Sequence, residues 1–153
     1  MIDISWPLTE DMTRYKERKL FHTRFFRVFS KDNARQSLAA MDSHAGTHID
    51  APAHYVKNGK TIDKVKLEIF NGRCRVLDLS KLNVIGKDNL VKFKIKAGER
   101  ILLKTKNSDL KANAKFNYDF VYLDASGGEY LASKKVKCVG IDYLGIERNQ
   151  KGH

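Results

Sequence analysis

The stretch HAGTHIDAPAH at residues 44–54 constrains the local backbone more than any other part of the chain. It holds three of the five histidines in the 153-residue sequence. Two histidines four residues apart can share one face of a helix. Gly46, Thr47 and Pro52, however, are poor residues for a helix interior. We therefore expect a strand that leads into a turn and wraps its polar side chains around one point.

The residue types in this stretch are those that bind transition metals. His44 and His48 lie four residues apart, and Asp50 follows two residues later. Imidazoles and a carboxylate are ordinary ligands for zinc or another divalent ion. Asp50 has two oxygens, so it could bind one ion or bridge two. Gly46 would let the backbone pass close to the metal or adopt a positive φ angle.

His54 lies two residues beyond Pro52, which limits the backbone conformations at the exit from the motif. This position leaves His54 available as a base or as a group that orients a ligand. The alternative is that all three histidines only satisfy hydrogen bonds in a core. Three histidines that share a short segment with an aspartate, a glycine and a proline favour a metal site instead.

The remaining segments indicate an α/β fold. Most of them read as short strands rich in apolar and β-branched residues, at 25–30, 35–44, 72–80, 99–106, 120–126 and 136–147. The helix candidates are short and lie at residues 63–70, 88–93 and 128–134. The last of these lies between two strand candidates, which resembles a βαβ crossover. We expect a mixed β-sheet core with few short helices.

The positive charge of the chain invites a nucleic-acid interpretation. Its net charge is +11, from 29 basic and 18 acidic residues. The lysines are dispersed, however, and the alternating KFKIK segment at 92–96 suggests the solvated face of a strand. No nucleic-acid-binding signature accompanies the charge. We therefore expect no nucleic-acid partner.

Membrane insertion and secretion are not expected either. No apolar run approaches the roughly 20 residues that span a bilayer. The opening MIDISWPLTEDM lacks the basic and apolar regions of a secretory signal, so we expect a cytoplasmic protein. Exposed apolar sheet edges favour association, so we also expect a homo-oligomer.

Taken with its flanking segments, the motif resembles a known family signature. The pattern HxGTHxDxPxH is similar to that of the cyclase family, which includes bacterial kynurenine formamidases and related amide and ester hydrolases. Residues 3–8, DISWPL, resemble the DISxPL opening of that family. Residues 139–147, VGIDYLGIE, resemble its later VGID segment, so the resemblance extends over nearly the whole chain.

This resemblance implies a cyclase-like fold of the swivelling β/β/α type and a metal-dependent hydrolase. His44 and His48 would bind the first metal, Asp50 would contact one or both ions, and His54 would be the general acid and base. Zinc is the expected ion, with manganese as the alternative. The substrate would be a small amide or ester, such as an N-formyl amide or a cyclic amide. Tyr15 is the one aromatic residue that persists from a region lining the substrate pocket in the family.

The sequence departs from the family pattern near its end. The family completes its site with a histidine and a glutamate beyond the VGID segment, whereas this sequence ends soon after it, with His153 as its last residue. We therefore expect a single cyclase-like domain at 1–153 that is C-terminally truncated relative to the family. We also expect at most one weakly held ion and low or absent activity. The alternative is a non-catalytic metal-binding protein on the same fold.

Overall fold

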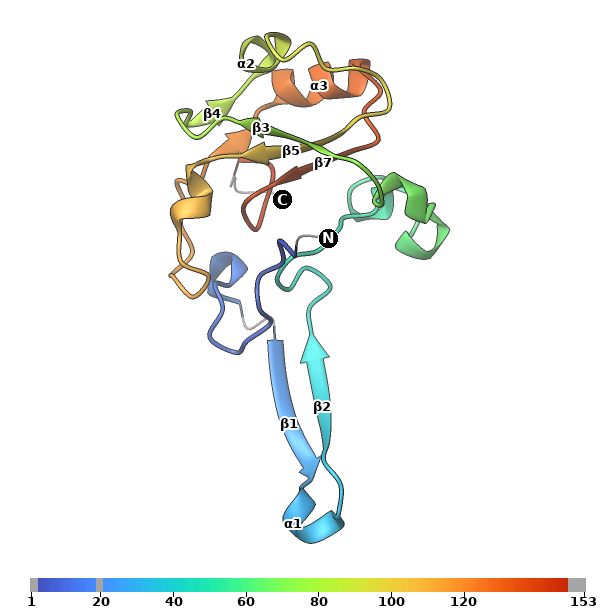
Figure 1. The fold of residues 1–153 in the computed structure, drawn as a ribbon, viewed down its shortest axis with the longest axis vertical. Helices are drawn as coiled ribbons and strands as arrows, with labels where there is room; N and C mark the ends of the chain where they lie inside the picture. The colour runs from blue at the N-terminus through green and yellow to red at the C-terminus, as the bar shows by residue number, and fades with distance from the viewer. Residues whose placement is uncertain (1–2, 19–20, 149–153) are drawn as a thin grey trace. The chain divides into compact units, whose positions relative to one another are not determined.

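The computed structural model describes residues 3–18 and 21–148, and its residues group into two compact units (Figure 1). The first unit consists of Met1–Asp50 together with Lys111–Phe116, and the second of Ala51–Leu110 together with Asn117–His153. His153 lies outside the described residues. The single domain at 1–153 stays a prediction.

The second unit is built on parallel strands. Its main sheet has the order β3-β5-β7, and β4 pairs with β6 in a separate parallel pair. Parallel neighbours need a crossover connection, and α2 lies in the chain between β3 and β5, while α3 lies between β5 and β7. The bounds are β3 Arg75–Asp78, β4 Val84–Ile85, α2 Lys87–Val91, β5 Arg100–Lys104, β6 Tyr122–Leu123, α3 Ala125–Ser133 and β7 Cys138–Ile141.

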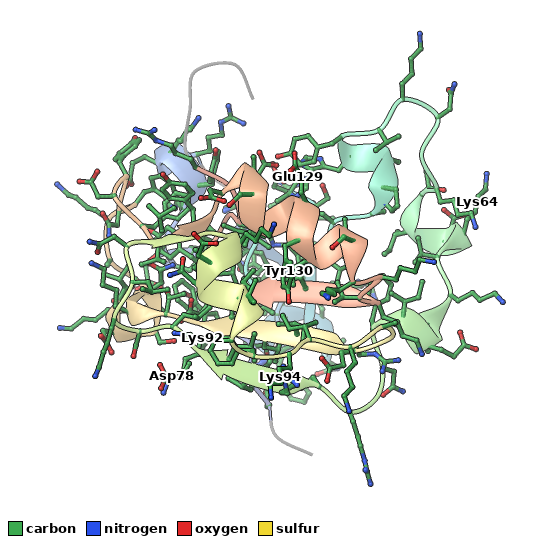
Figure 2. The ribbon with its side chains drawn as sticks, turned by 90° about the horizontal axis from the view of Figure 1, so that it is seen from above. Lys64, Asp78, Lys92, Lys94, Glu129 and Tyr130 are labelled. Atoms are coloured by element: carbon green, nitrogen blue, oxygen red, sulfur yellow. The ribbon has the colours of Figure 1, made fainter. Side chains whose placement is uncertain are left out.

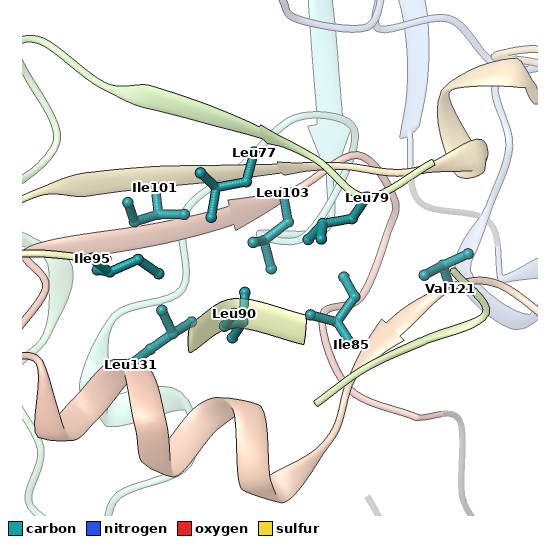
Figure 3. Packing of buried hydrophobic residues seen from close by; sticks show 9 residues of the cluster. All are labelled: Leu77, Leu79, Ile85, Leu90, Ile95, Ile101, Leu103, Val121 and Leu131. Carbon is teal, nitrogen blue, oxygen red and sulfur yellow. The ribbon is translucent and has the colours of Figure 1, made fainter. Parts of the chain in front are cut away.

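One face of the main sheet forms the core of this unit. Leu77 in β3 and both Ile101 and Leu103 in β5 are almost fully buried, because alternate residues of a strand point to the same face. They pack with Leu90 of α2 and Leu131 of α3 (Figure 3). The two helices also contact each other. The core is therefore a sheet covered by a layer of short helices.

The buried polar residues Thr105 and Asn107 hold the segment after β5 in place through hydrogen bonds. Asp142, the aspartate of the VGID segment, accepts hydrogen bonds from the backbone nitrogen of Thr105 at 2.7 Å and from its hydroxyl at 2.8 Å. The Ser108 hydroxyl donates to the same carboxylate. The amide of Asn107 pairs with the backbone of Val121 in both directions, at 2.9 Å each. Asp142 therefore fixes the 3-10 helix η5, Lys106–Asp109.

The first unit contains an antiparallel hairpin and a small apolar cluster. Strands β1, Phe21–Arg27, and β2, Gln36–Met41, pair with a register shift near Phe25, and the short helix α1, Phe29–Asp32, joins them. Buried Met12 and Ala45 pack with Tyr15 and Phe21. The remaining 3-10 helices are η1 Tyr15–Glu17 in this unit and η2 Pro52–His54, η3 Ile62–Lys64 and η4 Leu67–Ile69 in the second.

The α/β class with few short helices is confirmed, with antiparallel and parallel pairing in separate sheets. The helices expected at 88–93 and 128–134 correspond to α2 and α3, whereas 63–70 forms only η3 and η4.

The βαβ crossover expected around α3 is partly wrong. The strand before α3, β6, pairs with β4, and the parallel partner of the strand after α3, β7, is β5. The 92–96 segment is also not a strand: Lys94 has a φ of 49°, which turns the chain after α2.

The dispersed lysines of the sequence lie on different elements of the second unit. Lys64 belongs to η3, whereas Lys92 and Lys94 follow α2, and all three are exposed (Figure 2). Within residues 3–18 and 21–148, no helix has the length and apolar character needed to cross a bilayer.

Adjacent residues in β3 provide a direct test of this core. We expect Leu77→Ala to lower the free energy of unfolding by about 2–5 kcal/mol, because Leu77 is 2% exposed and truncation leaves a cavity. Val76→Ala is the control, because Val76 is 55% exposed on the opposite face and should cost no more than about 1 kcal/mol. Urea unfolding of both variants measures the difference, and equal losses would contradict the assignment of the buried face.

Candidate metal centre

The motif begins as a turn directly after β2. The backbone nitrogen of His44 donates to the Asp42 carboxylate at 2.8 Å, and the backbone nitrogen of Ala45 donates to the Asp42 carbonyl at 3.0 Å. An aspartate that accepts bonds from the backbone two residues later stabilises this kind of turn. Ala45 is 3% exposed and belongs to the apolar cluster of the first unit. The turn is thus fixed at one end by Asp42 and at the other by Ala45.

Gly46 meets both conditions that favour glycine. Its φ angle is +62°, in the left-handed region that side chains disfavour. A methyl group added to Gly46 would lie 2.6 Å from Cδ2 of Leu8. The chain therefore bends between His44 and His48 at a residue whose φ angle disfavours a side chain, and an added methyl group would also require the Leu8 side chain to move.

The opening segment of the chain packs on the motif within the first unit. The backbone nitrogen of Trp6 donates to the Thr47 hydroxyl at 3.0 Å. Ahead of it, Asp3 accepts hydrogen bonds from the hydroxyl and the backbone nitrogen of Ser5, which lower the pKa of the Asp3 carboxyl. These contacts give the DISWPL opening a structural role beside the motif.

The side chains of His44, His48 and Asp50 converge. Each offers one ligand atom, and these three atoms lie within 4.8 Å of one another. Nδ1 of His44 is 2.8 Å from Oδ1 of Asp50, and Nε2 of His48 is 3.6 Å from the same oxygen. The two imidazole rings meet edge to face, with 4.9 Å between their centroids.

A hydrogen bond orients the ring of His48. Its Nδ1 lies 2.9 Å from the carbonyl oxygen of Gly46. A carbonyl can only accept, so Nδ1 is the donor. Nε2, the other ring nitrogen, faces Asp50 at 3.6 Å from Oδ1. Metal-binding histidines commonly use this arrangement, in which the second ring nitrogen donates to a carbonyl and orients the ligand.

The cluster fits a divalent ion. Bond lengths near 2.0–2.2 Å would put neighbouring ligand atoms of a tetrahedral zinc site about 3.4 Å apart. The two distances to Oδ1 of Asp50, 2.8 and 3.6 Å, lie on either side of that value, and all three donor atoms lie within 4.8 Å of one another. Their side chains are 35%, 18% and 42% exposed for His44, His48 and Asp50, so solvent and small molecules reach them. Three protein ligands leave a tetrahedral ion one open position, which is the pattern of catalytic zinc sites.

The other two predicted site residues lie in different settings. His54 closes η2 in the second unit, where it is exposed and meets the ring of Tyr55 edge to face at 4.2 Å. Tyr15 is half-buried in the first unit, against Phe116 at 5.1 Å between ring centroids. The roles of His54 in proton transfer and of Tyr15 in a substrate pocket stay predictions.

Three supporting residues were not anticipated from the sequence: Leu8, Asp42 and Thr47. Only Asp42 carried a usable signal, because an aspartate two residues ahead of a turn often accepts its backbone bonds. Leu8 and Thr47 act through segments distant in the chain, so neither contact follows from local spacing.

Comparison with known proteins agrees with the geometry. Residues 2–148 match the Cyclase family model, and the chain belongs to that family. It is 34% identical to the kynurenine formamidase of Bacillus thuringiensis subsp. konkukian (strain 97-27) over 149 residues, and 33% identical to that of Bacillus anthracis. Each alignment covers 95% of this chain and 69% of the relative, so the chain spans about two thirds of their length.

Solved structures share the fold. A potential metal-dependent hydrolase with cyclase activity superimposes with a TM-score of 0.84 at 37% identity, covering 99% of this chain and 72% of the other. Isatin hydrolase A from Labrenzia aggregata, at 18% identity, superimposes with a TM-score of 0.79, covering 99% of this chain and 71% of the other, and this likeness shows the fold alone. Family membership and the cluster together support a divalent metal as cofactor.

The turn at Gly46 can be tested against another glycine of positive φ. We expect Gly46→Ala to destabilise the protein by more than the roughly 1–2 kcal/mol of a left-handed alanine, and to weaken metal binding. Gly98→Ala is the control, because Gly98 has a φ of +80° and no atom within 4 Å of an added methyl group. Urea unfolding and zinc titration calorimetry measure the two effects.

The double variant Leu8→Ala/Gly46→Ala separates the steric contribution from the backbone contribution. Removing the Leu8 side chain should recover the excess loss and leave only the cost seen at Gly98. Equal losses in Gly46→Ala and Gly98→Ala would show that the Leu8 contact has no energetic role.

Proposed function

We propose that this protein is a metal-dependent hydrolase that cleaves the carbon–nitrogen bond of a small amide, with N-formyl amides as the first substrate class. A single observation carries the proposal: His44, His48 and Asp50 converge within 4.8 Å in the motif of a chain whose relatives include kynurenine formamidases. Related esters and cyclic amides present the same carbonyl and belong to the same proposal.

In this proposal His44, His48 and Asp50 hold one divalent ion. Two imidazoles and a carboxylate suit zinc, whereas manganese favours sites richer in oxygen; we therefore propose zinc. When bound, such an ion supplies a Lewis acid for the substrate carbonyl and lowers the pKa of water towards neutrality. The hydrogen bond between Nδ1 of His48 and the Gly46 carbonyl orients the His48 ring, and it does not involve Nε2, the nitrogen proposed to bind the ion.

His54 is the proposed general acid and base. It would accept the proton released by the attacking water and return it to the leaving nitrogen. Its backbone is well supported, because Pro52 opens the 3-10 turn and the backbone nitrogen of His54 donates to the Ala51 carbonyl at 2.9 Å. Tyr15 is proposed to contribute to the substrate pocket as an aromatic surface.

Histidine variants test these roles separately. His48→Ala should lose both bound metal and hydrolysis, because it removes a ligand. His54→Gln should retain the metal while kcat falls by about 100-fold to 10,000-fold, the range for a lost general acid or base. His22→Ala is the control, because His22 lies in β1, where it pairs with Glu10 at 3.2 Å and belongs to no metal cluster among the described residues.

Metal content is measured by elemental mass spectrometry on protein purified without chelator. Turnover is measured with an N-formylated aromatic amine and with an aryl ester. Metal loss in His54→Gln would make His54 a ligand and overturn its assigned role. A wild-type protein that holds its ion but cleaves neither substrate would overturn the hydrolase proposal while leaving the metal centre intact.

A further inference from the structure

The sequence contains two asparagine–glycine pairs, Asn58-Gly59 and Asn71-Gly72. In such a pair the backbone nitrogen of the glycine can attack the side-chain amide of the asparagine, because glycine has no side chain to obstruct the approach. Both pairs lie in the second unit, and both asparagines are exposed. The local sequence makes both pairs candidates for this reaction, and the folded structure distinguishes them.

The glycine of the first pair is held in place. The backbone nitrogen of Gly59 donates to the Val56 carbonyl at 2.8 Å. A methyl group added to Gly59 would lie 2.6 Å from the carbonyl carbon of Pro52, so this glycine lies directly against the backbone of η2. The Lys60 carbonyl also accepts a hydrogen bond from the backbone nitrogen of Ala53 at 3.1 Å. Attack by the Gly59 nitrogen would require its hydrogen bond to break and the chain to move away from η2.

The glycine of the second pair has neither restraint. Within residues 3–18 and 21–148, no acceptor takes a hydrogen bond from the backbone nitrogen of Gly72. Gly72 is exposed, and the three atoms nearest to an added methyl group all belong to the side chain of Arg100 rather than to backbone. The Gly72 nitrogen can therefore approach the Asn71 side chain without losing a hydrogen bond.

A positive charge lies beside this nucleophile. Nε of Arg100 donates to the Ile69 carbonyl at 2.7 Å, and the same guanidinium donates to the Glu68 carbonyl. Its Nη1 lies 2.9 Å from the position that a Cβ atom on Gly72 would occupy. The Gly72 nitrogen must lose its proton to attack, and a nearby positive charge favours the negatively charged form of a group that loses a proton. Arg100 therefore favours the reaction at the second pair.

We propose that Asn71 is a site of spontaneous deamidation in the folded protein and that folding protects Asn58. The Gly72 nitrogen forms a bond to Cγ of Asn71 while the bond between Cγ and Nδ2 breaks. The proton of the Gly72 nitrogen passes through solvent to Nδ2, which leaves as ammonia. The cyclic imide then adds one water and opens at either carbonyl, to aspartate or to isoaspartate, so water is the only co-reactant.

The products change both the charge and the backbone at this position. Each event converts a neutral amide into a carboxylate, which lowers the net charge of +11 by one. The isoaspartate product also adds a methylene group to the main chain. Asn71 lies between η4 and β3, so this change falls in the loop that the Arg100 guanidinium contacts.

Peptide mapping by mass spectrometry tests the proposal on the full chain, incubated in mildly alkaline buffer. In the folded protein Asn71 should deamidate at least about fivefold faster than Asn58, the ratio expected where one hydrogen bond must break before Gly59 can react. The same chain incubated in urea is the control. Unfolding removes the contacts around both pairs, so the two rates should become similar.

Two variants assign the product to its site. Asn71→Gln should remove most of the acidic species that ion-exchange chromatography separates from the folded protein, because glutamine reacts through a larger and slower-forming ring. Asn58→Gln is the matched control and should leave the amount of that species unchanged. Urea unfolding of both variants checks that each substitution leaves the fold intact.

The proposal fails if the folded protein deamidates equally at both sites, faster at Asn58, or at neither. An excess at Asn71 that persists unchanged in urea would assign the difference to local sequence rather than to structure, which also overturns it. These measurements require neither bound metal nor turnover, so their outcome is independent of the proposed function.

Discussion

The left-handed turn at Gly46 is the constraint on which the candidate metal centre depends. It reverses the chain between His44 and His48, so that both rings can face the carboxylate of Asp50. The same turn aims the Gly46 carbonyl at His48, whose Nδ1 donates to it. One backbone conformation thus provides both the direction of the side chains and a hydrogen bond that orients one of them. The Leu8 side chain lies over Gly46, where a methyl group added to Gly46 would be 2.6 Å from its Cδ2.

The convergence of His44, His48 and Asp50 could be predicted from the sequence because the relevant information is local. Residue type and spacing identify these three as candidate donors, and Gly46 as the point where the chain must turn. The same local logic found α2 and α3. What it could not provide is the support from distant segments, such as Trp6 donating to Thr47, because no periodicity encodes which parts of a chain will lie together.

Strand pairing also depends on contacts between distant segments, which local sequence patterns do not predict. The strand near 120–126 was recognisable, but its partner depends on how the crossovers stack, and β6 pairs with β4 rather than joining β7. In the 92–96 segment, apolar and charged residues alternate as in a strand. The alternation instead reflects a turn in which Ile95 is buried while Lys94 takes a positive φ. Alternation reports which side chains are buried, and a tight turn can bury alternate residues without any strand.

The compactness of the ligand set has a thermodynamic consequence. All three donors lie within seven consecutive residues, 44–50, so a disordered chain already keeps them near one another. An ion stabilises a folded protein only to the extent that it binds the folded state better than the unfolded one. Binding of an ion by the same three residues in the unfolded chain would reduce the stabilisation that it gives to the folded protein. For candidate ligands drawn from one short loop, folding contributes the orientation of the donor atoms, through the turn at Gly46, in addition to their proximity.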